Sequence, residues 1–151
     1  MKNPLFRFKQ FQIDQSKSAM KIGTDGVLLG AWTSVNCKPK TILDIGSGTG
    51  LIALMLAQRT ASSIIKAIEI EEDAAAEAAA NFKDSPWSDR LELIHADILN
   101  YTQKSIETFD LIVSNPPFLP LLLRHQKTQE VPLEIITTFP TKICFLVLIN
   151  Y

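Results

Sequence analysis

The stretch Thr41-Ile42-Leu43-Asp44-Ile45-Gly46-Ser47-Gly48-Thr49-Gly50 decides the fold of this chain. A short apolar run that contains one acid precedes three glycines at alternate positions, and the apolar segment 51–57 follows them. The pattern predicts a buried strand, a tight turn and a helix, because glycine lets the backbone turn sharply and lets a ligand approach it closely. The helix start leaves free N–H groups that face the turn. This G-x-G-x-G spacing fits a nucleotide site, and it equally fits an ordinary strand-to-helix turn.

Strands and helices are expected to alternate after this stretch. The predicted strands are 41–45, 64–70, 91–95 and 109–114, and the predicted helices are 49–59 and 71–82, with a loop or short helix over 97–107. This alternation indicates βαβ units and a parallel sheet with ligands at the C-terminal ends of the strands. The expected fold class is therefore α/β, a Rossmann-like, doubly wound and mostly parallel sheet. The C-terminal part of that fold is expected to be missing or irregular.

Length and composition exclude several classes of protein. The 151 residues suffice for one domain with a core, and a chain that is 46% hydrophobic and 21% charged is ordinary for a globular protein. Cys37 and Cys144 lie far apart, which argues against a disulfide framework and favours a reducing, cytoplasmic location. The N-terminus lacks the apolar region of a secretory signal, and no run approaches a membrane span of roughly 20 apolar residues.

Charge divides the chain into a basic N-terminal segment and an acidic body. Residues 1–40 hold seven basic and two acidic side chains, whereas residues 41–118 hold five basic and twelve acidic ones. A basic arm can contact a nucleic acid, although a solvated face gives the same pattern. Within this arm, residues 3–21 predict one or two short strands. Thr24 or Asp25 is expected to cap a short helix over 27–32.

Two acids follow predicted strands where a nucleoside ligand would lie. Glu69 ends the second strand 19 residues after Gly50, near the position at which an acid binds the ribose hydroxyls in doubly wound nucleotide sites. Asp97 follows the third strand, where a carboxylate can accept a hydrogen bond from an adenine amino group. Either residue can also be a solvated acid at a strand end.

The segment Asn115-Pro116-Pro117-Phe118 directly follows the fourth predicted strand. Two prolines stiffen the loop and remove two N–H donors, but their carbonyl groups still accept hydrogen bonds. The Asn115 side-chain carbonyl is a second kind of acceptor. Two converging acceptors can bind both protons of an amino group and leave its lone pair directed outward, while Phe118 can stack on a flat ring. The alternative is a rigid turn at the end of a strand.

These motifs, within residues 20–118, resemble the S-adenosylmethionine-dependent methyltransferases that modify amino groups. The resemblance implies S-adenosylmethionine as cofactor and no metal. It implies that the glycine loop and its acid bind the methionine part, Glu69 the ribose and Asp97 the adenine amino group. The cofactor-binding residues would then be Asp44, Gly46, Gly48, Gly50, Glu69, Asp97 and Asn115. The residues acting on the target nitrogen would be Asn115, Pro116 and Phe118.

Segments 8–11 and 20–32 resemble the bacterial tRNA (adenine-N6)-methyltransferases that modify the adenine beside the anticodon of a valine tRNA. The resemblance implies N6-methylation of an adenine in a single-stranded tRNA loop. The basic residues expected to contact the RNA backbone are Arg7, Lys9, Lys17 and Lys21. Phe118 is expected to stack on the base. The alternatives are a glutamine-N5 methyltransferase of release-factor type, an rRNA guanine-N2 methyltransferase, and a cofactor-binding but inactive fragment. The oligomeric state stays open.

The periodic pattern stops after Phe118. We expect three parts: a substrate-side basic arm with a short helix over 1–40, an S-adenosylmethionine-binding core over 41–118, and an atypical tail over 119–151. The tail contains three prolines and no glycine, with one possible buried strand at 143–149. The family has further strands after the proline loop, so a truncated or frame-shifted end is our hypothesis. It predicts that the fourth strand lies at an uncovered edge of the sheet.

Overall fold

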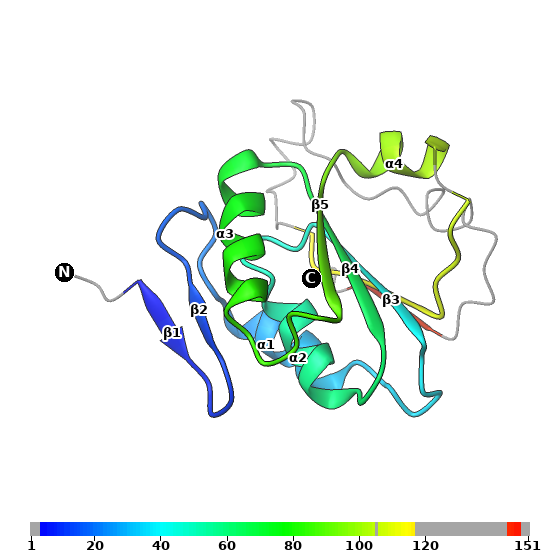
Figure 1. Cartoon of the computed structure of the whole chain (residues 1–151), viewed down its shortest axis with the longest axis horizontal. Coiled ribbons are helices and arrows are strands. Elements are labelled where there is room, and N and C mark those ends of the chain that lie inside the picture. The colour runs from blue at the N-terminus through cyan, green and yellow to red at the C-terminus, as the bar shows by residue number, and fades with distance from the viewer. Residues whose placement is uncertain (1–3, 105, 117–144, 149–151) are drawn as a thin grey trace.

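A computed structural model describes residues 4–104, 106–116 and 145–148 of the chain (Figure 1). Its elements are β1 (Leu5–Arg7), β2 (Gln12–Asp14), α1 (Thr24–Trp32), β3 (Thr41–Ile45), α2 (Leu51–Arg59), β4 (Ile64–Glu69), α3 (Glu72–Lys83), β5 (Leu91–His95), α4 (Ile98–Lys104), β6 (Leu111–Ser114) and β7 (Phe145–Leu148). The predicted alternation of strands and helices is confirmed. The predicted strands over 41–45 and 91–95 agree with the structure at both ends.

The main sheet has five parallel strands in the order β5-β4-β3-β6-β7. The chain starts this sheet at its centre with β3, continues outward through β4 and β5, and then returns to the other side of β3 as β6. The C-terminal end of β3 is therefore the point at which the strand order reverses. In open α/β sheets that point forms the ligand crevice.

The strand β7 corrects one prediction. Residues Phe145–Leu148 pair in parallel with Leu111–Ser114, so β6 is not at an uncovered edge of the sheet. The apolar run 143–149 indicates a possible strand, but the prediction of an uncovered edge gave it no partner, because an apolar run alone does not show which strand it pairs with.

Each face of the sheet has its own core. On one face, alternate strand residues pack with the buried side of α2 and with Phe82 of α3; they include Ile42, Ile65, Ala67, Leu111 and Val113. On the other face, Leu43, Ile45, Ile68 and Ile112 pack with Ile98 of α4 and with Phe109. The alternation follows from the two-residue period of a strand. These two layers hold the carboxyl ends of the strands at one edge of the sheet.

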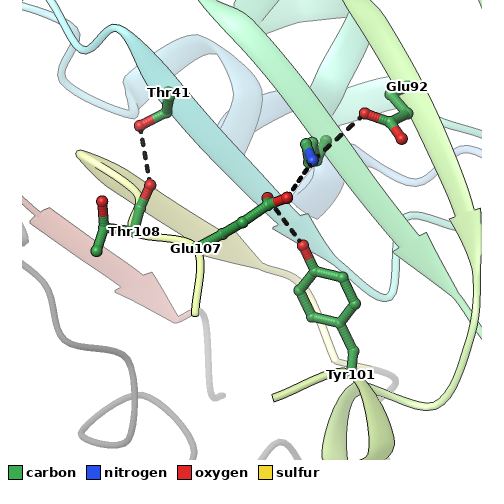
Figure 2. A network of polar contacts seen from close by, with 6 residues as sticks. Thr41, Glu92, Tyr101, Glu107 and Thr108 are labelled. Carbon is green, nitrogen blue, oxygen red and sulfur yellow. Dashed lines mark hydrogen bonds and ion pairs between the residues drawn. The ribbon is translucent and has the colours of Figure 1, made fainter. Parts of the chain in front are cut away.

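A polar network fixes the segment that leads into β6 (Figure 2). Nζ of Lys66, on β4, lies 2.7 Å from Oε1 of Glu107 and 3.5 Å from Oε2 of Glu92. The Tyr101 hydroxyl, on α4, donates to Oε2 of Glu107 over 3.1 Å. The hydrogen bond with Glu107 raises the pKa of Lys66 and lowers the pKa of Glu107. Because these groups are partly exposed, the network adds little stability, but it links the segment before β6 to β4 and α4.

The N-terminal segment is attached to α3. The hairpin of β1 and β2 lies beside this helix (Figure 1). The Asn81 amide binds both backbone groups of Asp14, at 2.8 and 2.9 Å, and also donates to the Thr49 carbonyl over 3.0 Å. One side chain of α3 therefore joins the hairpin to the glycine loop. This contact brings residues far apart in the sequence to one end of the sheet.

The glycine loop generates a prediction about stability. Gly46 and Gly50 both have positive φ, at 70° and 81°. A Cβ at Gly50 would lie 2.4 Å from Cε1 of Phe82, whereas a Cβ at Gly46 would meet no atom within 4 Å. Gly50→Ala should therefore cost about 2–4 kcal/mol of unfolding free energy, from backbone strain and overlap together.

Gly46→Ala is the matched control, because it adds only the strain of about 1–2 kcal/mol. Chemical denaturation of the two variants and the wild type measures the difference. An equal loss of unfolding free energy in both variants would show that overlap with Phe82 adds nothing to the cost of a side chain at position 50.

Candidate active site

The loop between β3 and α2 has a backbone shape that suits glycine. Gly46, Gly48 and Gly50 have φ values of 70°, 54° and 81°, a region that L side chains rarely adopt. The N–H groups of Gly46 and Ser47 donate to the Ile68 carbonyl over 2.9 and 3.1 Å. These bonds hold the loop against the end of β4, so the loop and the acid that ends β4 belong to one structure.

Glu69 holds the loop in place. Its Oε2 accepts from the Gly48 N–H over 2.7 Å, and its Oε1 accepts from the Ile70 and Glu71 N–H groups over 2.9 and 3.0 Å. The side chain is buried. An ionised carboxylate has about four acceptor positions, so about one remains for a ligand.

Asp44 lies beneath the loop and is fully buried. Its Oδ2 accepts from the Ala53 N–H over 3.1 Å, which satisfies a free amide in the first turn of α2. The pKa of Asp44 is raised to about 7, mainly because burial disfavours the charged form. The hydrogen bond from Ala53 lowers this pKa by a smaller amount, and the charge of Glu69 raises it further. Among the described residues, Oδ1 of Asp44 and Oγ of Ser47 are buried side-chain atoms without a hydrogen-bond partner. Such unsatisfied groups are costly and concentrate at functional sites.

A cavity of about 680 Å³ opens beside the loop, at the C-terminal end of the sheet. Its described lining comes from four parts of the chain: Lys17, Ser18, Ala19 and Met20; Ile45, Gly46 and Gly48; Ile68, Glu69, Ile70, Glu71, Asp73 and Ala74; and Ala96, Ile98 and Asn115. A Cβ on Gly46 or Gly48 would meet nothing within 4 Å, so the loop leaves open space above it. The volume is that of a small-molecule site.

Glu77 of α3 fixes the segment that forms one wall of this cavity. Its carboxylate is buried and accepts from the N–H groups of Lys17 and Ser18, over 2.6 and 3.0 Å, and from the hydroxyls of Ser16 and Ser18. Burial alone would raise the pKa of Glu77, but these hydrogen bonds together lower it. The negative charge is therefore retained, and residues 16–18 stay against α3.

The four basic residues predicted to contact RNA lie in different surroundings. Lys17 lines the cavity. The Lys21 ammonium group donates to the carbonyls of Gln15 and Ser18, so it stabilises the loop in which it lies. Arg7 and Lys9 are exposed on the β1–β2 hairpin and are not among the residues that line the cavity.

The segment after β6 brings Asn115 to the cavity. Nδ2 of Asn115 donates to Oδ2 of Asp25 over 2.8 Å. Pro116 follows directly, while Pro117 and Phe118 lie outside the described residues. The expectation that Phe118 stacks on a base therefore falls on a part of the chain that the structure does not describe.

Asp97 is placed differently from Asn115. Its Oδ1 accepts from the Leu99 N–H over 2.8 Å at the start of α4. Its neighbours Ala96 and Ile98 line the cavity, but Asp97 is not among the lining residues. In this structure the Asp97 side chain therefore binds a backbone N–H group in the first turn of α4.

Sequence reasoning missed the connection between Asp25 and Asn115. The expected cap by Thr24 or Asp25 is wrong, because α1 begins at Thr24 with Gly23 as N-cap and no side-chain capping bond. The Asp25 carboxylate instead contacts a residue 90 positions away. Its position in a turn-rich cluster gave no signal for this contact. Glu77 was missed for the same reason, since its helix looked like an ordinary alanine-rich helix.

Two classes of feature are absent from the described parts of the chain. Within residues 4–104, 106–116 and 145–148, no group of three His, Cys, Asp or Glu side chains is placed to hold a metal ion. In the same residues, no helix has the length and apolar character needed to cross a membrane.

Comparison with known proteins gives similar sequences and similar structures. The chain is 59% identical over 114 residues to a Flavobacterium psychrophilum protein named tRNA1(Val) (adenine(37)-N6)-methyltransferase, covering 76% of this chain and 49% of that protein. A Bacteroides thetaiotaomicron protein of the same name is 56% identical over 119 residues, covering 78% and 49%. The chain thus spans about half the length of these curated relatives.

A solved structure has a related fold. The O-methyltransferase from Bacillus cereus in complex with SAH has a TM-score of 0.54 and 25% identity, over 65% of this chain and 47% of that one. The central parallel sheet and its glycine loop therefore define a class I methyltransferase fold. The model of the methyltransferase small domain family matches residues 16–139. The chain belongs to this methyltransferase small domain family.

The raised pKa of Asp44 makes stability depend on pH. Below pH 4 the group is protonated in both the folded and the unfolded state, and above pH 7 it is ionised in both. Between these limits the folded state binds more protons, so stability falls as the pH rises from about 4 to about 7. Asp44→Asn removes this loss, and its unfolding free energy should gain about 2–4 kcal/mol relative to wild type between pH 4 and pH 8.

Denaturant melts at several pH values measure this gain. Asn100→Ala, at an exposed position and with no titratable group involved, is the control and should keep a constant difference from wild type. A difference for Asp44→Asn that does not change with pH would contradict the raised pKa.

Proposed function

We propose that this chain is the cofactor-binding and base-binding part of an S-adenosylmethionine-dependent enzyme that methylates N6 of an adenine in tRNA. The names of the relatives at 54–59% identity support this substrate, and the adenine beside the anticodon of a valine tRNA is the proposed target. In this proposal residues 41–118 bind the cofactor and residues 1–40 form the substrate side. Because its substrate is a tRNA, the enzyme would act in the cytoplasm.

The residues around the cavity fit S-adenosylmethionine. The open space above Gly46 and Gly48 lets a ligand reach the main chain, and the cavity is large enough for a nucleoside with an amino acid attached. Glu69 lies in the cavity wall and retains one acceptor position for a ribose hydroxyl. The unsatisfied Ser47 hydroxyl lies in the loop itself. We propose that Gly46, Gly48 and Glu69 bind the cofactor directly.

We propose indirect roles for the remaining cofactor candidates. Asp44 and Gly50 would shape the loop, because the former binds the Ala53 amide and the latter packs beneath Phe82. Asp97 differs from these two, because its carboxylate uses one acceptor position on the Leu99 amide and would bind the adenine amino group through another. These assignments separate residues that touch the ligand from residues that hold the loop.

The side-chain carbonyl of Asn115 and the backbone carbonyl of Pro116 would each accept a hydrogen bond from the target amino group. When bound, S-adenosylmethionine supplies an electrophilic methyl group whose bonding electrons leave with sulfur, while the attacking amino nitrogen gives up a proton to water. The two acceptors orient the amino group and polarise it as its nitrogen becomes positive. Phe118 would stack on the base, which must leave its own stack to reach the cavity. No strong base is needed in this mechanism, since the proton leaves after the attack.

Contact with the RNA would begin at the mouth of the cavity. Lys17 lines the cavity, so its ammonium group can meet a phosphate next to the target base. Arg7 and Lys9 would contact the backbone farther away, on the β1–β2 hairpin. Lys21 would act through the loop that it holds in place.

The observation that carries this proposal is the position of Asn115 in the wall of the same cavity as the glycine loop and Glu69. Asn115→Ala should lower methyl transfer to a tRNA1(Val) transcript by about 100-fold or more, since it removes an acceptor for the reacting group. Its affinity for S-adenosylmethionine, measured by calorimetry, should change by only about threefold.

Asn100→Ala, at an exposed position on α4, is the matched control and should transfer at the wild-type rate. A wild-type chain that binds S-adenosylmethionine without any transfer would favour the alternative of a binding module. Transfer to a release factor or to rRNA instead of tRNA would support the glutamine-N5 or guanine-N2 alternative. Near-normal transfer by Asn115→Ala would reject the assigned role of this residue.

A further inference from the structure

The Asp25 carboxylate, in the first turn of α1, contacts the Asn115 side chain at the end of β6. Nδ2 of Asn115 donates a hydrogen bond of 2.8 Å to Oδ2 of Asp25, and both side chains are partly buried. The two residues lie 90 positions apart in the sequence. Such a contact needs α1 to be placed accurately against the sheet.

Two glycines set the position of α1. A Cβ on Gly26 would lie 3.1 Å from Cδ2 of Leu51, and a Cβ on Gly30 would lie 2.6 Å from Sδ of Met55. The helix therefore packs against α2 more closely than larger residues permit. Because Leu51 is the first residue of α2 after the glycine loop, this packing also ties Asp25 to the loop.

The contact has a fixed direction. The hydrogen bond from Asn115 is the main cause that lowers the pKa of Asp25, so the carboxylate is ionised at neutral pH. An ionised carboxylate only accepts hydrogen bonds, and Asn115 must therefore turn its Nδ2 toward it. The amide carbonyl Oδ1 lies on the other arm of the same planar group. It receives no hydrogen bond from any other described residue, and Asn115 lines the cavity.

We propose that Asp25 is a positioning residue for methyl transfer, which fixes the Asn115 amide so that Oδ1 is presented to the target amino group. This inference rests on the proposed function. Without Asp25 the amide can turn over, and its Nδ2 would then oppose the amino protons of the substrate. The carboxylate charge also polarises the amide, which makes Oδ1 a better acceptor while positive charge develops on the attacking nitrogen.

Steady-state kinetics with S-adenosylmethionine and a tRNA1(Val) transcript tests the catalytic consequence. In Asp25→Ala, kcat should fall about 10- to 100-fold, the usual effect of removing a residue that orients a reacting group, with KM for S-adenosylmethionine changed by at most about twofold. Asp25→Asn can still accept from Nδ2 but lacks the charge, so its kcat should lie between those of Asp25→Ala and wild type. Asp89→Asn is the exposed control. Wild-type kcat in Asp25→Ala would overturn the inference.

Nuclear magnetic resonance tests the same contact without turnover. In the ¹⁵N-labelled full chain, one Nδ2 proton of Asn115 should resonate downfield, as expected for a hydrogen bond to a carboxylate. Asp25→Ala should lose this shift, Asp25→Asn should retain part of it, and a dispersed spectrum verifies that each variant is folded. Unchanged Asn115 side-chain signals in both variants would overturn the inference. A wild-type chain without transfer would reject the proposed function, while these spectra would still decide whether Asp25 orients Asn115.

Discussion

The backbone of the glycine loop, held by two carboxylates, is the constraint on which the rest of the structure depends. Glu69 at the end of β4 accepts from the Gly48 amide, and Asp44 of β3 accepts from the Ala53 amide of α2, so β3, β4 and α2 meet at fixed positions. Positive φ angles at the glycines let the chain turn within a few residues. The cavity exists because this turn keeps side chains away from the end of the sheet.

Holding the loop in this way has an energetic cost. Asp44 is fully buried, one of its oxygens has no partner among the described residues, and its pKa is raised to about 7. An uncompensated group of this kind lowers the stability of the ligand-free protein. A positively charged ligand in the neighbouring cavity would reduce this cost, since it favours the ionised carboxylate.

The N-terminal segment belongs to the site as much as the sheet does. Buried polar side chains of α3, Glu77 and Asn81, bind the backbone of residues 14–18 and bring that segment to the cavity wall. Close packing of α1 on α2 brings Asp25 to Asn115. In both cases hydrogen bonds of buried or partly buried side chains favour one arrangement of segments that are distant in the sequence. Residues 17–20 and Asp25 therefore lie beside the glycine loop and the end of β6, although they are distant from both in the sequence.

By itself, the sequence determined the parallel α/β fold, the glycine loop and the strand ends at which Glu69 and Asn115 lie, because these depend on local periodicity and on glycine conformation. It did not determine the partner of Asp25, the role of Glu77, the present contact of Asp97 with Leu99 or the pairing of β7 with β6. The contacts of Asp25 and Glu77 and the pairing of β7 join segments that are distant in the sequence, so no local pattern encodes them. The Asp97 bond is local, but an acid after a strand can equally face a ligand, and only the side-chain orientation distinguishes the two. Only the tertiary structure therefore decided which polar groups face the cavity and which hold its walls in place.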